Sequence, residues 1–211
     1  MTPPRRQRLV FAALVGLSAC GPPIPRSTTP VPYPGTLRAP SAYAGDFMLD
    51  QSVTAIHAGG QETFRAILEK RGDALVMVGL GPHGGRAFVL RQEGDAVSFE
   101  SFLDRALPFP PRYMLLDVHR VWLAGLPGAP LADGTHEAVI DGERVTERWA
   151  EGRLLGRTFE RLDGAPPGRI TITYDGGLDP SPGAPPPTRV ELDQGWFGYR
   201  LVLEGLRRTP L

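Results

Sequence analysis

The chain has 211 residues, of which 23 are lysine or arginine and 23 are aspartate or glutamate, so its formal net charge at pH 7 is zero. That balance excludes a polycationic protein that holds nucleic acid by charge. A single cysteine excludes a disulfide framework, and the length suffices for one domain with a hydrophobic core of its own.

The first 19 residues have the pattern of a secretory signal peptide. The arginine-containing opening MTPPRRQR is followed by the uncharged apolar run LVFAALVGLS, and the small residues Ser18 and Ala19 stand before the cysteine. A positive segment, a short apolar run and small residues in this order are typical of a cleaved leader. The apolar run is too short for a membrane-spanning helix, which needs about 20 residues. We therefore expect residues 1–19 to be removed.

The only cysteine, Cys20, stands directly behind this leader. Leu17-Ser18-Ala19-Cys20 resembles the bacterial lipobox, at which the cysteine thiol is joined to diacylglycerol, the chain is cut and the new amine is acylated, commonly with palmitate. Two or more acyl chains anchor a protein stably to a bilayer. Because Gly21 replaces the aspartate that retains lipoproteins at the inner membrane, the resemblance implies the outer membrane, facing the periplasm. An ordinary cleaved signal peptide and a buried structural thiol remain the alternatives.

Residues 20–45 are predicted to be a proline-rich tether that begins at the lipidated cysteine. Seven prolines occur between Gly21 and Pro40, and no apolar periodicity is present. Proline fixes φ and cannot donate to a strand ladder, so an extended polyproline-II conformation is expected. The alternative is a disordered spacer with no further role. The remaining residues, 46–211, are predicted to form a folded β domain.

Short alternating segments fill the first half of that domain. Polar and apolar residues alternate within them and glycine-containing turns separate them, which is the pattern of antiparallel hairpins with one solvated face. The connections are too short for crossover helices. Five strands are therefore expected, at residues 46–57, 61–71, 74–80, 86–92 and 96–101.

The stretch 107–130 breaks the alternation and predicts one amphipathic helix of three to four turns. Prolines precede Arg112, which favours a helix start, and apolar residues recur at helical spacing from Met114 to Trp122. Gly125 is expected to end the helix.

Six further strands are expected behind the helix, with Asp141-Gly142 and Glu151-Gly152 as tight hairpin turns. An antiparallel sheet of about eleven strands tends to curl or to close. The predicted fold class is therefore mainly β: a curled antiparallel sheet, or unclosed β-barrel, with the central amphipathic helix as a lid. The six segments are residues 135–140, 144–150, 153–162, 169–174, 188–193 and 198–206.

The order of signal, tether, five strands, helix and six strands resembles the LolA/LolB group of periplasmic lipoprotein carriers. Three segments are similar to a LolB strand with its Gly-Pro-x-Gly turn, to the segment that closes its central helix and to its final strand pair: residues 69–90, 121–130 and 189–206. An uncharacterised lipoprotein family (a domain of unknown function, 3261-type), some of whose members accompany aryl-polyene gene clusters, is closer still. That likeness lies in residues 111–123, 170–174 and 195–204.

The chain departs from LolB at two places. It has the proline-rich tether in place of the longer N-terminal helix, and it lacks a clear exposed apolar loop for membrane delivery. The apolar segment 102–109 is the candidate substitute for that loop.

The resemblance implies an apolar concave face under the helix that holds acyl chains. Burial of apolar area, at about 25 cal/mol per Å², would drive such binding, and methionine and aromatic side chains suit irregular space. A curled sheet with one helix needs the same residues to make a filled core, so both interpretations stay open. The candidate lining residues are Phe64, Leu68, Leu75, Met77, Phe88, Leu90, Phe99, Tyr113, Leu116, Trp122, Trp149, Phe159 and Tyr199.

The predicted function is that of an outer-membrane lipoprotein that binds a hydrophobic or acylated ligand for periplasmic transport or envelope assembly. No nucleophile elbow, HExxH motif or phosphate loop occurs and the four histidines lack metal-ligand spacing, so no enzyme, cofactor or metal site is expected. Asp117 and His119 are two residues apart and would not share a helix face. The alternative is a non-catalytic scaffold or accessory subunit that binds an envelope protein through exposed residues such as Trp196 and Phe197.

Overall fold

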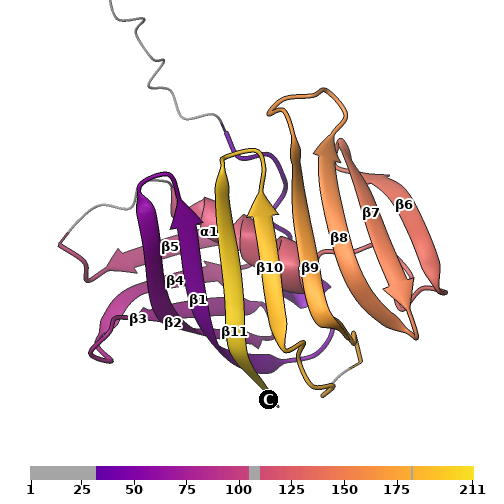
Figure 1. The fold of residues 1–211 in the computed structure, drawn as a ribbon. Helices are drawn as coiled ribbons and strands as arrows, with labels where there is room; N and C mark the ends of the chain where they lie inside the picture. Colours follow the sequence, from indigo (N-terminus) through magenta and orange to yellow (C-terminus); the bar gives the residue numbers. More distant parts are fainter. Residues whose placement is uncertain (1–31, 105–109, 182) are drawn as a thin grey trace, which may run out of the picture. The chain divides into compact units, whose positions relative to one another are not determined.

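The first and last strands of the chain lie side by side at the centre of one antiparallel sheet. In the computed structural model, residues 32–104, 110–181 and 183–211 are described, and they form eleven strands in the order β5-β4-β3-β2-β1-β11-β10-β9-β8-β7-β6 (Figure 1). The strands are β1 (Phe47–His57), β2 (Gly60–Arg71), β3 (Ala74–Leu80), β4 (Arg86–Glu93), β5 (Ala96–Ser101), β6 (Gly134–Ile140), β7 (Glu143–Ala150), β8 (Arg153–Arg161), β9 (Arg169–Leu178), β10 (Arg189–Gln194) and β11 (Tyr199–Pro210).

Two meanders make up this sheet: the first contains β1 to β5 and the second β6 to β11. The pairing of β1 with β11 joins them. Val53 lies opposite Leu203 in that central pair. The outer strands are β5 and β6, which are not paired with each other, so among the described residues the sheet stays unclosed. The predicted fold class, a curled antiparallel sheet of eleven strands with one helix, is confirmed.

The tight turns of the second meander have the chemistry that the sequence indicates. Both central positions have positive φ: Asp141 at 51° with Gly142 at 76°, and Glu151 at 53° with Gly152 at 69°. Two-residue turns of this kind match the twist of the strands that they join. They fix the register of β6 on β7 and of β7 on β8.

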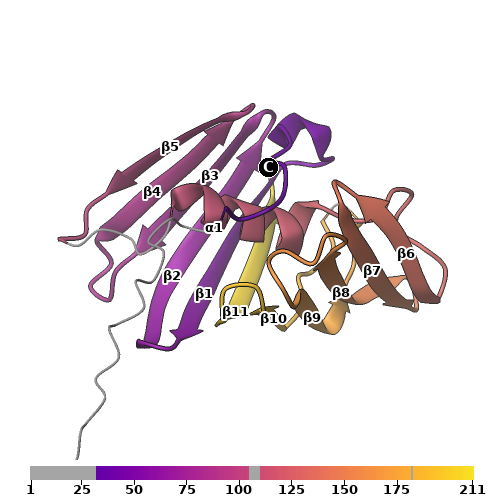
Figure 2. The same cartoon turned by 90° about the horizontal axis from the view of Figure 1, so that it is seen from above.

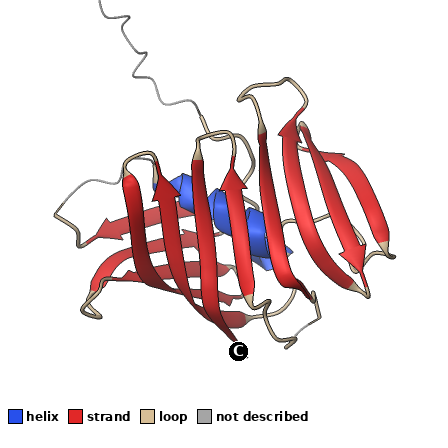
Figure 3. Ribbon diagram, in the orientation of Figure 1, coloured by secondary structure: helices blue, strands red, loops and turns tan. Residues whose placement is uncertain are grey.

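One helix connects the two outer strands and lies within the curve of the sheet (Figures 2 and 3). It starts as α1 (Pro111–Val118), where the first-turn proline loses no hydrogen bond. It continues as a π-helical turn (His119–Leu123), in which the Ala124 N–H donates to the His119 carbonyl at 2.6 Å. The backbone is extended at Ala124, so the helix ends just before the glycine that we expected to end it.

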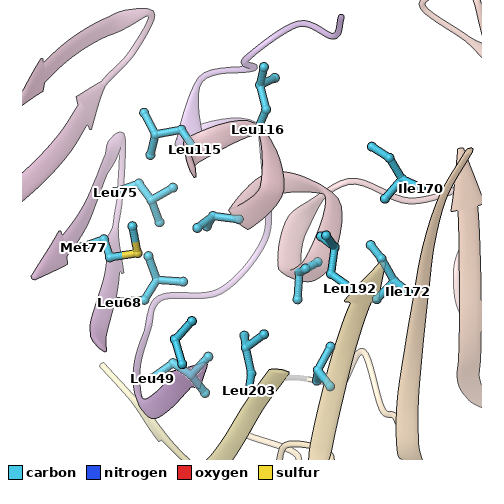
Figure 4. Packing of buried hydrophobic residues seen from close by; sticks show 14 of the residues in the cluster. Leu49, Leu68, Leu75, Met77, Leu115, Leu116, Ile170, Ile172, Leu192 and Leu203 are labelled. Carbon is cyan, nitrogen blue, oxygen red and sulfur yellow. The ribbon is translucent and has the colours of Figure 1, made fainter. Parts of the chain in front are cut away.

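The hydrophobic core lies around the helix and takes side chains from both meanders (Figure 4). Leu68 and Leu75 come from the first meander, Ile172 and Leu192 from the second and Leu115 from the helix, and all five are fully buried. Because both meanders share this core, residues 32–211 form one compact unit.

Residues 32–45, which we call the N-terminal segment, are part of that folded unit and lie across the helix (Figure 2). Tyr33 and Leu37 are each only 5% exposed and belong to the core. Gly35, at a φ of 120°, lies so close to Arg120 that a Cβ atom there would come within 2.9 Å of its guanidinium. We predicted a tether as far as residue 45. The structure differs because the side chains of Tyr33 and Leu37 are buried in the core, which keeps this part of the chain on the folded domain.

The predicted signal peptide, Cys20 and the first part of the predicted tether lie outside the described residues. Within the described residues, no helix has the length and apolarity that crossing a bilayer requires. Residues 105–109 of the apolar segment 102–109 also lie outside, and Phe102 at its start is 44% exposed.

Candidate functional site

A cleft of about 440 Å³ lies between the N-terminal segment, the C-terminal end of the helix and strands β7 and β8. Its inner wall includes the buried side chains of Leu116, Leu154 and Phe159. Thr36 and Asp141, which are exposed, also line it, so the cleft reaches solvent. An apolar wall with a few polar groups is typical of small-molecule sites, whose volumes are roughly 300–1,000 Å³.

The structure divides the thirteen predicted lining residues between this cleft and the packed core. Four of them line the cleft: Leu116, Trp122, Trp149 and Phe159. The other nine do not line it and belong instead to the hydrophobic core or its edge. Five of the nine are buried in the core, namely Leu68, Leu75, Met77, Phe88 and Leu90, and four are partly buried against it, namely Phe64, Phe99, Tyr113 and Tyr199.

The buried carboxylate of Asp117, on the helix, connects the N-terminal segment with the turn between β10 and β11. It accepts hydrogen bonds from the hydroxyls of Tyr33 and Tyr199 and, at 3.1 Å, from the Gln194 side-chain amide. Burial raises the pKa of Asp117, while the three donors act in the opposite direction. Tyr33 comes from the N-terminal segment, whereas Gln194 and Tyr199 flank the turn between β10 and β11, so the cluster is a structural clasp between two distant parts of the chain and the helix.

Arg120 forms a second buried cluster, beside the cleft that it helps to line. Its Nη2 donates to both oxygens of Glu143, at 2.8 and 3.0 Å, and to the Pro34 carbonyl at 2.9 Å. The guanidinium also lies over the rings of Tyr33, Phe159 and Trp196, within about 5 Å of each ring centre. Such cation–π contacts offset part of the cost of removing the charge from water.

A third cluster surrounds Glu147, which is fully buried. Its carboxylate accepts from Arg157 Nε at 2.6 Å, from Trp149 Nε1 at 2.9 Å and from the Leu126 N–H at 3.2 Å. Arg157 Nη1 in turn donates to the Arg120 carbonyl at 2.7 Å. The last carbonyls of a helix have no partner within the helix, so Arg157 satisfies one of them and fixes the helix end against β7 and β8.

His119 is buried although the sequence placed it and Asp117 on different faces of the helix. Its Nε2 lies 2.8 Å from the Gln92 side-chain oxygen and its Nδ1 lies 3.3 Å from the Tyr43 hydroxyl. Burial lowers its pKa to about 4, with the nearby positive charge of Arg112 contributing. Both residues are buried because the sheet and the N-terminal segment cover different sides of the helix.

These polar clusters were missed by sequence reasoning. A charged residue in an amphipathic helix normally marks the solvated face. Only the shortness of the apolar pattern around Asp117 and Arg120 could have indicated that these two residues are buried.

The prediction that Trp196 and Phe197 form an exposed contact patch is wrong. Trp196 is 8% exposed and donates to the Gly168 carbonyl at 3.1 Å, and Phe197 stacks on Tyr113.

Among the described residues, no group of three or more histidine, cysteine, aspartate or glutamate side chains is arranged to hold a metal ion. Two of the arginines that line the cleft, Arg120 and Arg157, are joined in buried ion pairs to Glu143 and Glu147. The site is therefore a cleft whose lining combines buried apolar side chains, such as Leu154, with charged groups such as Arg120.

The fold and the cleft define a class of protein, a single antiparallel sheet curled around one helix, with space for a small ligand beside the helix end. The chain belongs to the protein family of unknown function DUF3261, whose model matches residues 48–207, and the family predicted from the sequence is thereby confirmed. No curated protein sequence matches this chain.

The chain is similar to several solved structures, of which two are described. A LolA superfamily protein from Nitrosomonas europaea is 15% identical, with a TM-score of 0.45, over 82% of this chain and 87% of that one. A candidate outer membrane lipoprotein-sorting protein domain from Vibrio parahaemolyticus is 10% identical, with a TM-score of 0.40, over 78% of this chain and 86% of that one.

Proposed function

We propose that this protein is an envelope lipoprotein that binds one hydrophobic or acylated ligand in the cleft, for periplasmic transport or envelope assembly. The observation that carries the proposal is the cleft itself, because it extends from fully buried apolar side chains such as Leu154 to exposed residues such as Thr36. Each Å² of apolar ligand surface buried there contributes about 25 cal/mol. The volume of about 440 Å³ suits one small ligand.

The proposed function is non-catalytic. A ligand must be able to reach the proton of a general acid or the free electron pair of a general base. Asp117 and Glu147 are instead buried and engaged by three hydrogen bonds each. Their arrangement supports a role in fixing the walls of the cleft.

A ligand-binding test compares a cleft-filling variant with a matched control. Ala124 is half-buried and lines the cleft, so Ala124→Trp should occupy its space. Ala58 lies in the exposed turn between β1 and β2, so Ala58→Trp adds the same side chain away from the cleft. The chain used is residues 20–211 with Cys20→Ser, which contains the whole folded unit.

The readout is titration with a dansyl-labelled fatty acid. We expect saturable binding by the unfilled chain and by Ala58→Trp, and at least tenfold weaker binding by Ala124→Trp. Binding that is equal in all three chains would place the ligand elsewhere, and no binding to any of them would contradict the function.

The anchor in this proposal is a lipid on Cys20, with the protein on the periplasmic face of the outer membrane. The lipobox resemblance supports the lipid, and Gly21 behind the cysteine, in place of aspartate, supports the outer membrane. Cells that are fed a clickable palmitate analogue should label the wild-type chain and not Cys20→Ala, and only the wild type should fractionate with outer membranes. Equal labelling of both chains would refute lipidation at this cysteine.

A second candidate function is that of an accessory subunit which binds an envelope protein. The outer strands favour it, because Val139 on β6 is 61% exposed and Val97 on β5 is 37% exposed, and unpaired strand edges can pair with another chain. A stable co-purified protein that Val139→Lys releases, together with no bound lipid, would favour this function over the first.

A further inference from the structure

Arg208 is the one cation of the cleft whose charge has no acceptor within the described part of the chain. It lies on β11 opposite Leu49 of β1, is half-buried and lines the cleft. Its guanidinium lies over the Phe47 ring, 4.7 Å from the ring centre. Burial lowers the pKa of Arg208, which means that its charge has lost solvation without full compensation.

The other arginines of the cleft have carboxylate partners. Arg120 binds Glu143 at 2.8 Å, Arg157 binds Glu147 at 2.6 Å and the exposed Arg38 lies 3.9 Å from Asp141. The negative charge that acts on Arg208 through space is Asp179. The Asp179 carboxylate accepts the Ser181 N–H at 2.9 Å, and no ion pair joins it to Arg208 among the described residues.

A second donor in the same cleft also lacks a partner. Arg120 lines the cleft and is 4% exposed, and among the described residues its buried Nη1 has no hydrogen-bond acceptor. Buried donors without acceptors are costly and rare in folded proteins. A cleft with guanidinium N–H groups that lack acceptors, beside apolar side chains such as Leu154 and Phe159, is suited to a ligand that brings oxygen acceptors with its apolar part.

We propose that the ligand of the cleft is a single-chain amphiphile with an acidic head group, whose carboxylate or phosphate oxygens bind the Arg208 guanidinium while its chain lies along the apolar wall. This inference rests on the ligand-binding function proposed above. Guanidinium pairs with carboxylate or phosphate through two parallel hydrogen bonds, which are stronger than hydrogen bonds between neutral groups. The aromatic ring of Phe47 keeps the guanidinium in place for that pairing.

The experiment separates the head group from the chain. Palmitate and methyl palmitate, which has the same chain but no charge, are titrated below their aggregation limits as competitors of the dansyl-labelled fatty acid. Inorganic phosphate alone tests whether an anion binds without a chain. The variants are Arg208→Gln and, as a control on the same strand, Arg200→Gln, whose exposed side chain has only a loose 3.9 Å pair with Asp193.

We expect the unsubstituted chain and Arg200→Gln to bind palmitate about tenfold more tightly than its ester. Arg208→Gln should lose that preference and keep its affinity for the ester. Equal binding of palmitate and ester by the unsubstituted chain would overturn the acidic head group and leave the proposed function intact. Binding of neither would overturn both proposals.

Two further outcomes test whether Arg208 binds the head group and whether the apolar chain of the ligand contributes to binding. A preference for palmitate that persists in Arg208→Gln would overturn the assignment of the head group to Arg208. Competition by inorganic phosphate at the concentration of palmitate would show that the apolar chain adds nothing, and would overturn the amphiphile. The comparison of palmitate with its ester needs no variant, so it decides the ligand class even where Arg208→Gln does not fold.

Discussion

The Tyr33 hydroxyl donates a hydrogen bond to the Asp117 carboxylate across 84 residues of sequence, and both groups are buried. This bond joins the N-terminal segment to the central helix, and the cleft lies beside that junction. The walls of the cleft therefore depend on a polar contact between two parts of the chain that have no pairing in the sheet.

The first prediction concerns this clasp. Tyr33→Phe removes one donor from Asp117 and keeps the ring among its aromatic neighbours, so it should lower the free energy of unfolding by about 1–3 kcal/mol. Tyr43→Phe, at a half-buried site with a 3.3 Å contact to His119, should cost less. Urea unfolding measures both. Equal losses of unfolding free energy in the two variants would show that the Tyr33–Asp117 hydrogen bond contributes no more to stability than the Tyr43–His119 contact.

The second prediction concerns pH. Because burial lowers the pKa of His119 to about 4, from about 6.5 in an unfolded chain, the unfolded chain binds a proton in this window that the folded chain excludes. Stability should therefore fall as the pH drops from about 6.5 to about 4, by up to about 3 kcal/mol. Asp117, whose pKa burial raises, acts with the opposite sign at the acidic end.

Variants isolate the histidine in that experiment. The pH dependence of unfolding in His119→Gln should be flatter than in the wild type between about pH 4 and 6.5. His83→Gln changes an exposed histidine in the turn between β3 and β4 and should keep the wild-type slope. Identical slopes in all three proteins would refute the assignment to His119.

The third prediction concerns the buried pair of Glu147 and Arg157. Glu147→Leu leaves the Arg157 charge buried without its carboxylate, and should cost about 3–5 kcal/mol of unfolding free energy. The double variant Glu147→Leu/Arg157→Met removes both charges and should recover more than half of that loss. If the double variant is as unstable as the single one in urea, the penalty is not that of an unpaired charge.

The fourth prediction concerns the close contact of two strands. A Cβ atom on Gly79 of β3 would lie 2.2 Å from the ring of Phe88, its partner on β4. Gly79→Ala should therefore destabilise the fold by about 1–3 kcal/mol through overpacking. Gly85→Ala, where a Cβ atom would meet nothing within 4 Å, is the control and should be near neutral.

The strands and the helix could be predicted from the sequence because their signals are local. Alternation over six to twelve residues, together with turns such as Asp141-Gly142, identifies each hairpin without knowledge of its neighbours. The number of strands predicts a curled sheet. The pairing of β1 with β11 depends on the curl of the whole sheet, so no local pattern identifies it.

The clasp and the cleft could not be predicted in the same way. Tyr33 is an isolated aromatic residue among prolines, and its burial depends on Asp117, which is a surface residue by every local rule. A cleft lining and a filled core use the same side chains, so the sequence could not decide that Trp149 lines the cleft while Leu68 fills the core. Only the position of the helix within the sheet decides it.

The most direct test of the ligand-binding account is lipid mass spectrometry on the purified protein. The Cys20→Ser chain, secreted to a bacterial periplasm behind a non-lipoprotein leader, carries no covalent lipid on that residue, so organic solvent extracts only what the fold holds. The account predicts about one acyl-bearing molecule per chain, and none from Ala124→Trp. An extract without any acyl species, from protein whose circular dichroism shows an intact β fold, would contradict it.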